Sequence, residues 1–174
     1  MNELGQRLAR GEPTAFAELY DHCADRCHHY LTVFLGSRDA ADDVLQETFV
    51  RLVRNRGKLG GVENLPAYLF VAARNEALRF VSFRKHERER YVSLKCSDLF
   101  TDVDDPARRD TALAVADGLQ QLGAEQREVV ELKIYGRLTF REIAEVMSVP
   151  LQTAATRYRA ALQQLKEWFA RQPS

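Results

Sequence analysis

The chain has 174 residues, and 25 basic and 25 acidic side chains give it a formal net charge of zero. This length suffices for one domain or for two small ones. The sequence contains no run of about 18 apolar residues, so a membrane span is excluded. The first residues lack the apolar core of a secretion signal, and we therefore expect a cytoplasmic protein with free thiols at its three cysteines.

The charges are distributed unevenly along the chain. Basic side chains outnumber acidic ones over residues 74–95, whereas aspartates outnumber arginines over residues 98–117. Blocks of opposite sign predict a segment that faces a polyanion, followed by an acidic connector.

Apolar residues recur at helical spacing through most of the first half. A first helix is predicted over about residues 16–34 and is broken at Gly36 and Ser37. A second helix begins near Asp39, and a third follows Pro66. Between these two, the stretch "NRGKLGGVENLP" is predicted to be a loop because of its paired glycines and its closing proline.

Helical periodicity fades after Phe83 and returns at Leu113. A helix is predicted over about residues 125–135, with Gly136 placed to end it. The fold class is therefore all-α, with two small helical domains at residues 1–88 and 111–174. A flexible acidic linker at residues 89–110 is predicted to join them.

The stretch "TFREIAEVMSVPLQTAATRYRAAL" predicts a helix-turn-helix. Thr139 and Glu142 form a capping box at its start, and Pro150 suits the first turn of its second helix. One side of that second helix is apolar and is predicted to be buried: Leu151, Ala154, Ala155, Tyr158, Ala161, Leu162 and Leu165. The other side carries residues that suit a DNA major groove, namely Gln152, Thr153, Thr156 and Arg157. A plain helical hairpin with a solvated face is the alternative.

Basic and aromatic residues interleave in "AYLFVAARNEALRFVSFRK", as a single-strand nucleic-acid site requires. The polar candidates are Arg74, Asn75, Arg79, Arg84 and Lys85, and the aromatic residues are Tyr68, Phe70, Phe80 and Phe83. For Phe70 and Phe80, packing in the core is the preferred interpretation.

The stretch "SRDAADDVLQETFVRLV" carries a polar cluster beside a buried stripe of Val44, Leu45 and Phe49. The cluster consists of Asp42, Asp43, Gln46 and Glu47. An acidic face suits a basic partner surface. Ordinary solvation of a helix, with acidic residues favoured in its first turn, is the alternative.

The stretch "HCADRCHH" suggests a metal or redox site, but Cys23 and Cys27 lie on the apolar stripe of the first helix. Packing as small apolar residues is the preferred interpretation. No nucleophile with a base and no phosphate-binding loop is recognisable, so we expect no catalytic residue, metal or cofactor.

These three helical motifs, in this order, resemble those of bacterial sigma factors of the extracytoplasmic-function (ECF) group, over residues 15–89 and 111–168. The resemblance implies a non-enzymatic subunit that binds core RNA polymerase, recognises two promoter elements and promotes DNA melting. It assigns the acidic cluster to the polymerase and residues 54–66 to a flipped promoter base. It also implies an anti-sigma protein as a further partner.

Within this resemblance, the minus-ten residues are Tyr68, Arg74, Asn75, Arg79, Arg84 and Lys85, and the minus-35 residues are Gln152, Thr153, Thr156 and Arg157. Tyr68 stands where the family usually has tryptophan, and Arg79 where many members have aspartate. Ala154 and Ala155 replace a common valine and a common basic residue. Two interpretations compete with this one: a DNA-binding regulator that acts without polymerase, and an adaptor that binds no DNA.

Overall fold

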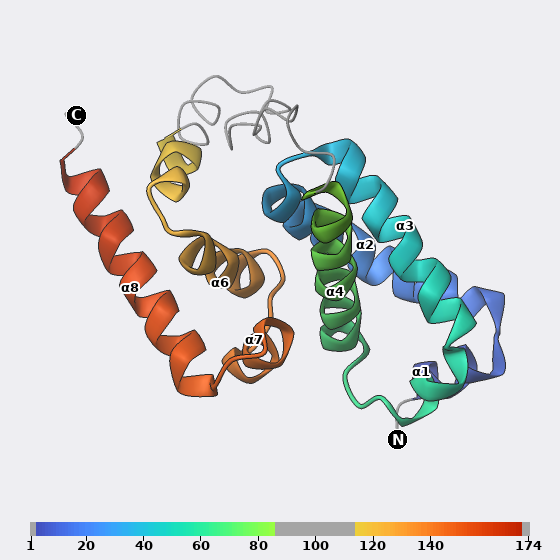
Figure 1. The fold of residues 1–174 in the computed structure, drawn as a ribbon. Coiled ribbons are helices and arrows are strands. Elements are labelled where there is room, and N and C mark those ends of the chain that lie inside the picture. Colours follow the sequence, from blue (N-terminus) through green and yellow to red (C-terminus); the bar gives the residue numbers. More distant parts are fainter. Residues whose placement is uncertain (1–2, 86–113, 172–174) are drawn as a thin grey trace. The chain divides into compact units, whose positions relative to one another are not determined.

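The computed structural model describes residues 3–85 and 114–171, which are helical apart from short turns. Contacts divide the chain into two compact units, Met1–Tyr91 and Val92–Ser174 (Figure 1). The segment predicted to be an acidic linker lies outside the described residues.

The first unit consists of four α-helices and one short 3-10 helix. They are α1 (Glu3–Arg10), α2 (Pro13–Leu35), α3 (Arg38–Arg54), η1 (Arg56–Gly61) and α4 (Leu65–Lys85). Helices α2, α3 and α4 pack on one another, whereas α1 packs mainly on η1 (Figure 1). The sequence analysis did not predict α1, and it placed a loop where η1 lies.

The turn between α2 and α3 follows from two adjacent residues. Gly36 adopts a left-handed conformation with φ of 66°, and its N–H donates to the carbonyl of Thr32 at 2.8 Å. The hydroxyl oxygen of Ser37 then accepts from the N–H of Ala40 at 3.2 Å, which caps the start of α3. The predicted break at this position is confirmed.

The core of the first unit includes both cysteines of α2. Cys23 and Cys27 are 1% and 0% exposed, so their predicted packing role is confirmed. Burial raises the pKa of both thiols. Further along α2, the ring of Tyr30 lies 5.7 Å from the ring centroids of Phe34 and Phe70, which joins α2 to α4.

In the second unit, helical residues 114–120 precede α6 (Ala124–Ile134), α7 (Phe140–Met147) and α8 (Leu151–Ala170). Helix α8 packs on both α6 and α7. After α6, the left-handed residue is Arg137 with φ of 54°. Gly136 is needed for a different reason: an added Cβ would lie 2.5 Å from the carbonyl oxygen of Leu132.

Across the described residues, none of the helices combines the length and the apolar character that crossing a membrane requires.

Candidate nucleic-acid interface

Local side-chain chemistry positions the helix-turn-helix formed by α7 and α8. The carboxylate of Glu142 accepts from the hydroxyl of Thr139 at 2.8 Å, and the Thr139 oxygen accepts from the N–H of Glu142 at 3.3 Å. Ser148 then turns the chain with φ of 55°, and Pro150 takes the N-cap position of α8. The predicted capping box is confirmed, and four residues of α7 are buried: Ile143, Ala144, Val146 and Met147.

The predicted buried side of α8 requires correction. Along α8, which lies wholly within the described residues, Ala154 and Ala161 are the two buried residues. Leu151 and Leu162 are 51% and 42% exposed, so the prediction that they are buried is wrong. The physical reason is that the alanines bring α8 close to α6 and α7, which have 11 and 8 residues against the 20 of α8. Helices this short cover only part of the apolar side of α8.

The outer side of α8 presents most of the residues predicted to read DNA. Gln152 and Thr156 are exposed, and Thr153 is half-buried. Ala160, on the same side, is also exposed and adds no bulk that would keep DNA at a distance. This side therefore permits a close approach of a major groove.

Arg157 is engaged inside its own unit. Its Nη2 atom lies 2.7 Å from the Oε2 atom of Glu125, the second residue of α6, and 24% of its side chain is exposed. An arginine in this ion pair has to leave or share its partner before it can contact phosphate.

Arg159 is exposed and was missed by the sequence analysis. Its Nε atom donates to the carbonyl of Ala155, in the turn before it, at 3.3 Å. Positions 152, 156 and 159 follow the helical spacing of four and three, so Arg159 shares a face with Gln152 and Thr156. That spacing is the signal that could have identified it.

In the first unit, α4 carries an exposed row at intervals of four residues: Asn75, Arg79 and Phe83. The Phe83 side chain is 80% exposed, whereas Phe70 is fully buried and Phe80 is half-buried. The core prediction is thus confirmed for Phe70. Other predicted residues of this helix differ in exposure, with Tyr68 and Arg74 half-buried. The side chains of Arg84 and Lys85 lie outside the described part of the structure.

Arg79 belongs to a chain of charged side chains that links α4 to α3. Its Nη1 atom lies 3.3 Å from Glu76 Oε2, and Arg51 Nε lies 2.9 Å from the same oxygen. Arg51 Nε is also 3.0 Å from Glu47 Oε1. Glu76 is 9% exposed, and its two cationic neighbours compensate its buried charge.

On α3, Asp42, Asp43 and Gln46 are exposed, as a partner-binding face requires, while Glu47 is half-exposed. Asp42 Oδ1 lies 2.9 Å from His28 Nε2, although the contact lacks hydrogen-bond geometry. Val44 and Leu45 are buried, as predicted for the stripe beneath the acidic face.

A groove of about 750 Å³ opens beside this face, between α2 and α3. Asp42 and Gln46 stand among its lining residues, and its apolar lining includes Tyr20, Phe49 and Val53. The rings of Tyr20 and Phe49 are in contact at a tilt of 57°, with their centroids 5.1 Å apart.

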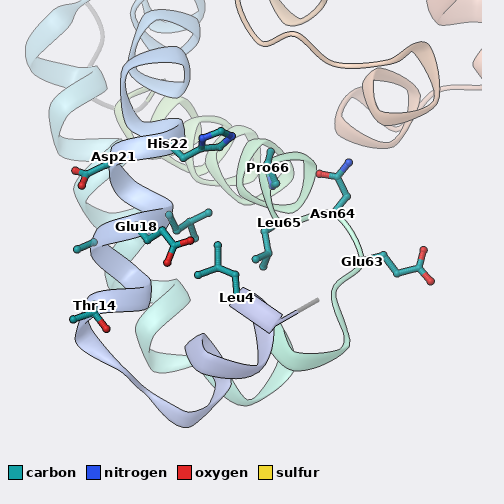
Figure 2. Close-up of a pocket in the computed structure, with 11 residues that line it drawn as sticks. Leu4, Thr14, Glu18, Asp21, His22, Glu63, Asn64, Leu65 and Pro66 are labelled. Carbon is teal, nitrogen blue, oxygen red and sulfur yellow. The ribbon is translucent and has the colours of Figure 1, made fainter. Parts of the chain in front are cut away.

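The segment between α3 and α4 is better ordered than the predicted loop. Arg56–Gly61 forms η1, with Leu59 only 1% exposed. Asn64 Oδ1 accepts from the N–H of Ala67 at 3.0 Å and caps the start of α4. A cavity of about 820 Å³ lies between α1, α2 and residues 63–66 (Figure 2).

Comparison with known families identifies both units. The model of Sigma-70 region 2 matches residues 19–89, and the model of Sigma-70, region 4, matches residues 112–165. The ECF RNA polymerase sigma factor SigK of Mycobacterium ulcerans is 29% identical over 171 residues, which cover 95% of this chain and 91% of the relative. The ECF RNA polymerase sigma factor BldN of Streptomyces coelicolor is 30% identical over 151 residues, which cover 84% of this chain and 57% of the relative.

The fold is also found among solved structures. CnrH in complex with the cytosolic domain of CnrY has a TM-score of 0.70 and 22% identity, covering 98% of this chain and 97% of that chain. The sigma factor RpoE in complex with the anti-sigma factor NepR from Bartonella quintana has a TM-score of 0.69 and 20% identity, covering 91% and 98%. At these identities the likeness concerns the fold alone.

Proposed function

The chain belongs to the ECF group of sigma-70 RNA polymerase sigma factors, and from this premise we propose how its residues divide the work of transcription initiation. Proteins of this family bring core RNA polymerase to promoters and recognise promoter DNA. We further propose that this chain is not itself an enzyme and acts in the cytoplasm. Its domains are taken as residues 1–88 for polymerase and the minus-ten element, 89–110 for the linker, and 111–174 for the minus-35 element.

The minus-ten surface is proposed to be the outer side of α4. The observation that carries this is the row Asn75, Arg79 and Phe83, which places an amide, a guanidinium and an 80% exposed ring one turn apart. A single strand needs charge for its backbone and a ring on which an unpaired base can stack. Further members of the proposed set are Tyr68, Arg74, Arg84 and Lys85.

The minus-35 surface is proposed to be the outer side of α8. Gln152, Thr153 and Thr156 supply hydrogen-bonding groups for base edges, and Arg157 is a phosphate contact in competition with Glu125. Arg159 joins the proposed set, because it is exposed on the same face.

Core polymerase is proposed to bind the face of α3 formed by Asp42, Asp43, Gln46 and Glu47. The exposed carboxylates suit a basic surface, and the neighbouring groove supplies apolar contact area. An anti-sigma protein is proposed as a further partner, since CnrH and RpoE, which share the fold, each bind a second protein in the structures described above, and the partner of RpoE is the anti-sigma factor NepR.

Run-off transcription with purified core polymerase tests the whole assignment. Wild-type protein is expected to direct initiation at a cognate promoter, and base changes in either promoter element are expected to reduce it. DNA binding without initiation would instead indicate a regulator that acts without polymerase, and the absence of both activities would indicate an adaptor.

A further inference from the structure

Helix α1 has no part in the surfaces proposed above, yet it packs closely on η1. Leu8 of α1 and Leu59 of η1 are 0% and 1% exposed. A Cβ added at Gly60 would lie 3.3 Å from Ala9 Cβ and 4.0 Å from the carbonyl oxygen of Gly5. The two backbones therefore approach each other with little room for movement.

The turn between α1 and α2 also contacts η1. Gly11 has φ of 80°, and a Cβ added there would lie 2.9 Å from Arg56 Nε. The side chain of Arg56, the first residue of η1, thus lies across this turn. Displacing α1 or the turn would displace η1.

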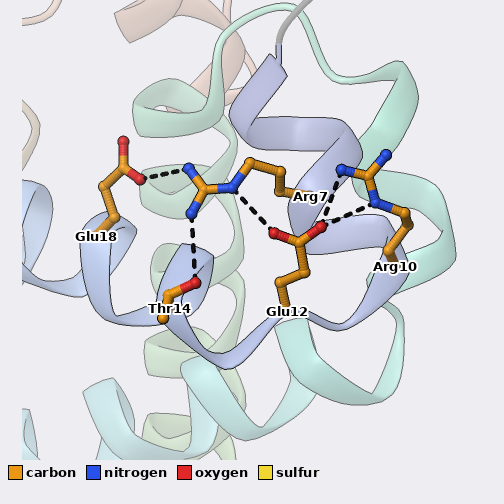
Figure 3. Close-up of polar contacts among 5 residues, drawn as sticks. All are labelled: Arg7, Arg10, Glu12, Thr14 and Glu18. Carbon is orange, nitrogen blue, oxygen red and sulfur yellow. Dashed lines mark hydrogen bonds and ion pairs between the residues drawn. The ribbon is translucent and has the colours of Figure 1, made fainter.

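Arg7 connects α1 to three residues at the start of α2 (Figure 3). Arg7 Nε donates to Glu12 at 3.0 Å, Nη1 donates to Glu18 at 2.8 Å, and Nη2 donates to the Thr14 hydroxyl at 3.3 Å. All three nitrogens of the guanidinium are used, and the planar fork fixes the angle between the two helices. Arg10 makes a simpler connection, because both of its bonded nitrogens reach Glu12 alone.

The charges of this cluster persist at neutral pH. Hydrogen bonds from Arg7, which has the larger effect, and from Arg10 lower the pKa of the Glu12 carboxyl. A lowered pKa means that the stabilisation is present above the ordinary carboxyl range and is lost only as pH falls through the lowered value.

Residues 63–66 line one side of a cavity of about 820 Å³, and α2 residues such as Glu18 and His22 line the other side (Figure 2). Within the segment, Leu65 is 3% exposed and anchors the start of α4. The segment is joined to η1 at one end and to the capped start of α4 at the other, so a displacement of η1 would be passed on to it.

We propose that α1, held by Arg7, is a brace that sets the position of η1 and residues 62–66, so that Arg7 is a positioning residue for minus-ten recognition. This inference rests on the proposed function and on the role that the resemblance to ECF sigma factors implies for residues 54–66, which is to receive a flipped promoter base. The brace acts before DNA binds, by keeping the receiving segment in one conformation. Arg7 touches neither polymerase nor DNA in this arrangement.

The test compares Arg7→Ala with Arg10→Ala, which removes the same charge from the same helix but a simpler set of bonds. Holoenzyme formed with each full-length variant is assayed for core binding by pull-down and for promoter opening by permanganate reactivity of minus-ten thymines. Arg7→Ala is expected to lower opening of duplex promoter about five-fold. Without the brace, the receiving segment samples other conformations, and ordering it when DNA binds costs free energy. Core binding and Arg10→Ala are expected to stay within about two-fold of wild type.

Three further measurements separate positioning from general loss of structure. Gly60→Val, which forces α1 and η1 apart, is expected to reproduce the defect from the opposite side of the contact. Hydrogen exchange of Arg7→Ala is expected to accelerate over residues 55–64 and to stay unchanged in α8. Arg7→Lys is expected to restore promoter opening only in part, since one ammonium group cannot reproduce the planar fork of the guanidinium.

The inference is overturned if wild-type holoenzyme opens the promoter and Arg7→Ala matches Arg10→Ala. It is also overturned if core binding falls together with opening, since the defect is then one of folding. Failure of the proposed function has a different signature, which is wild-type holoenzyme that opens no promoter in a minus-ten-dependent manner.

Discussion

The ion pair between Arg157 and Glu125 predicts which arginine of α8 contributes most to DNA binding. Arg157 is paired at 2.7 Å and is 24% exposed, whereas Arg159 is exposed and bonds only within its own helix among the contacts described. We therefore expect Arg159→Ala to weaken promoter binding more than Arg157→Ala. Glu125→Gln, which keeps the shape of the partner but removes its charge, should release Arg157 and strengthen binding.

The magnitudes follow from the exposure of the pair. Because Glu125 is 67% exposed, solvent screening limits the ion pair to about 0.5 kcal/mol, which is roughly a two-fold effect on affinity. A full phosphate contact contributes a salt slope of about 0.9. Between 50 and 200 mM salt this slope corresponds to roughly a three- to four-fold loss of affinity per contact.

Holoenzyme affinity for a promoter fragment, measured at these two salt concentrations, tests this ranking. Arg159→Ala should lower the slope by about one unit, Arg157→Ala by less, and Glu125→Gln should raise it. Equal slopes for the two alanine variants, together with no effect of Glu125→Gln, would refute the idea that the ion pair restrains Arg157.

Three other outcomes can be measured on the same protein. Asp43→Lys is expected to reduce core polymerase capture without changing the melting temperature, because exposed charges contribute little to stability, and unchanged capture would remove Asp43 from the interface. If the ring of Phe83 stacks on a base, Phe83→Ala should weaken single-strand DNA binding by about 1–3 kcal/mol, measured by fluorescence anisotropy. Unchanged binding would show that the ring does not contact a base. Burial raises the pKa of the Cys27 thiol. In a Cys23→Ala, Cys96→Ala variant, in which Cys27 is the one remaining thiol, iodoacetamide at pH 8 should therefore label the folded protein at least about ten-fold more slowly than the protein in urea. Equal rates would show that Cys27 is accessible.

The features that could be predicted from sequence are those set by neighbouring residues. The capping box at Thr139 and the break at Gly36 each depend on side-chain and backbone chemistry within one turn of helix. Helical periodicity also separated the outward residues of α8 from its two buried alanines, Ala154 and Ala161. In these places the local pattern and the tertiary structure require the same residues.

The features that were missed depend on contacts between distant residues. Leu151 and Leu162 carry the correct periodicity, but the pattern does not show how far the neighbouring helices extend. The partner of Arg157 lies on α6, and nothing near Arg157 in the sequence identifies it. Helix α1 is short and carries few apolar residues, so its pairing with η1 supplied the stability that periodicity could not indicate.

The double engagement of Glu76 restricts how promoter specificity can evolve in this chain. Many family members carry aspartate where Arg79 stands, but here such a change would place a carboxylate three residues from Glu76, which is 9% exposed. Two like charges at this spacing on one helix are unfavourable, and of the two cationic partners described here Glu76 would keep Arg51. Aspartate at position 79 is therefore expected to be tolerated better when position 76 is neutral. Libraries that diversify positions 76 and 79 together are expected to yield more functional minus-ten variants than libraries that diversify position 79 alone.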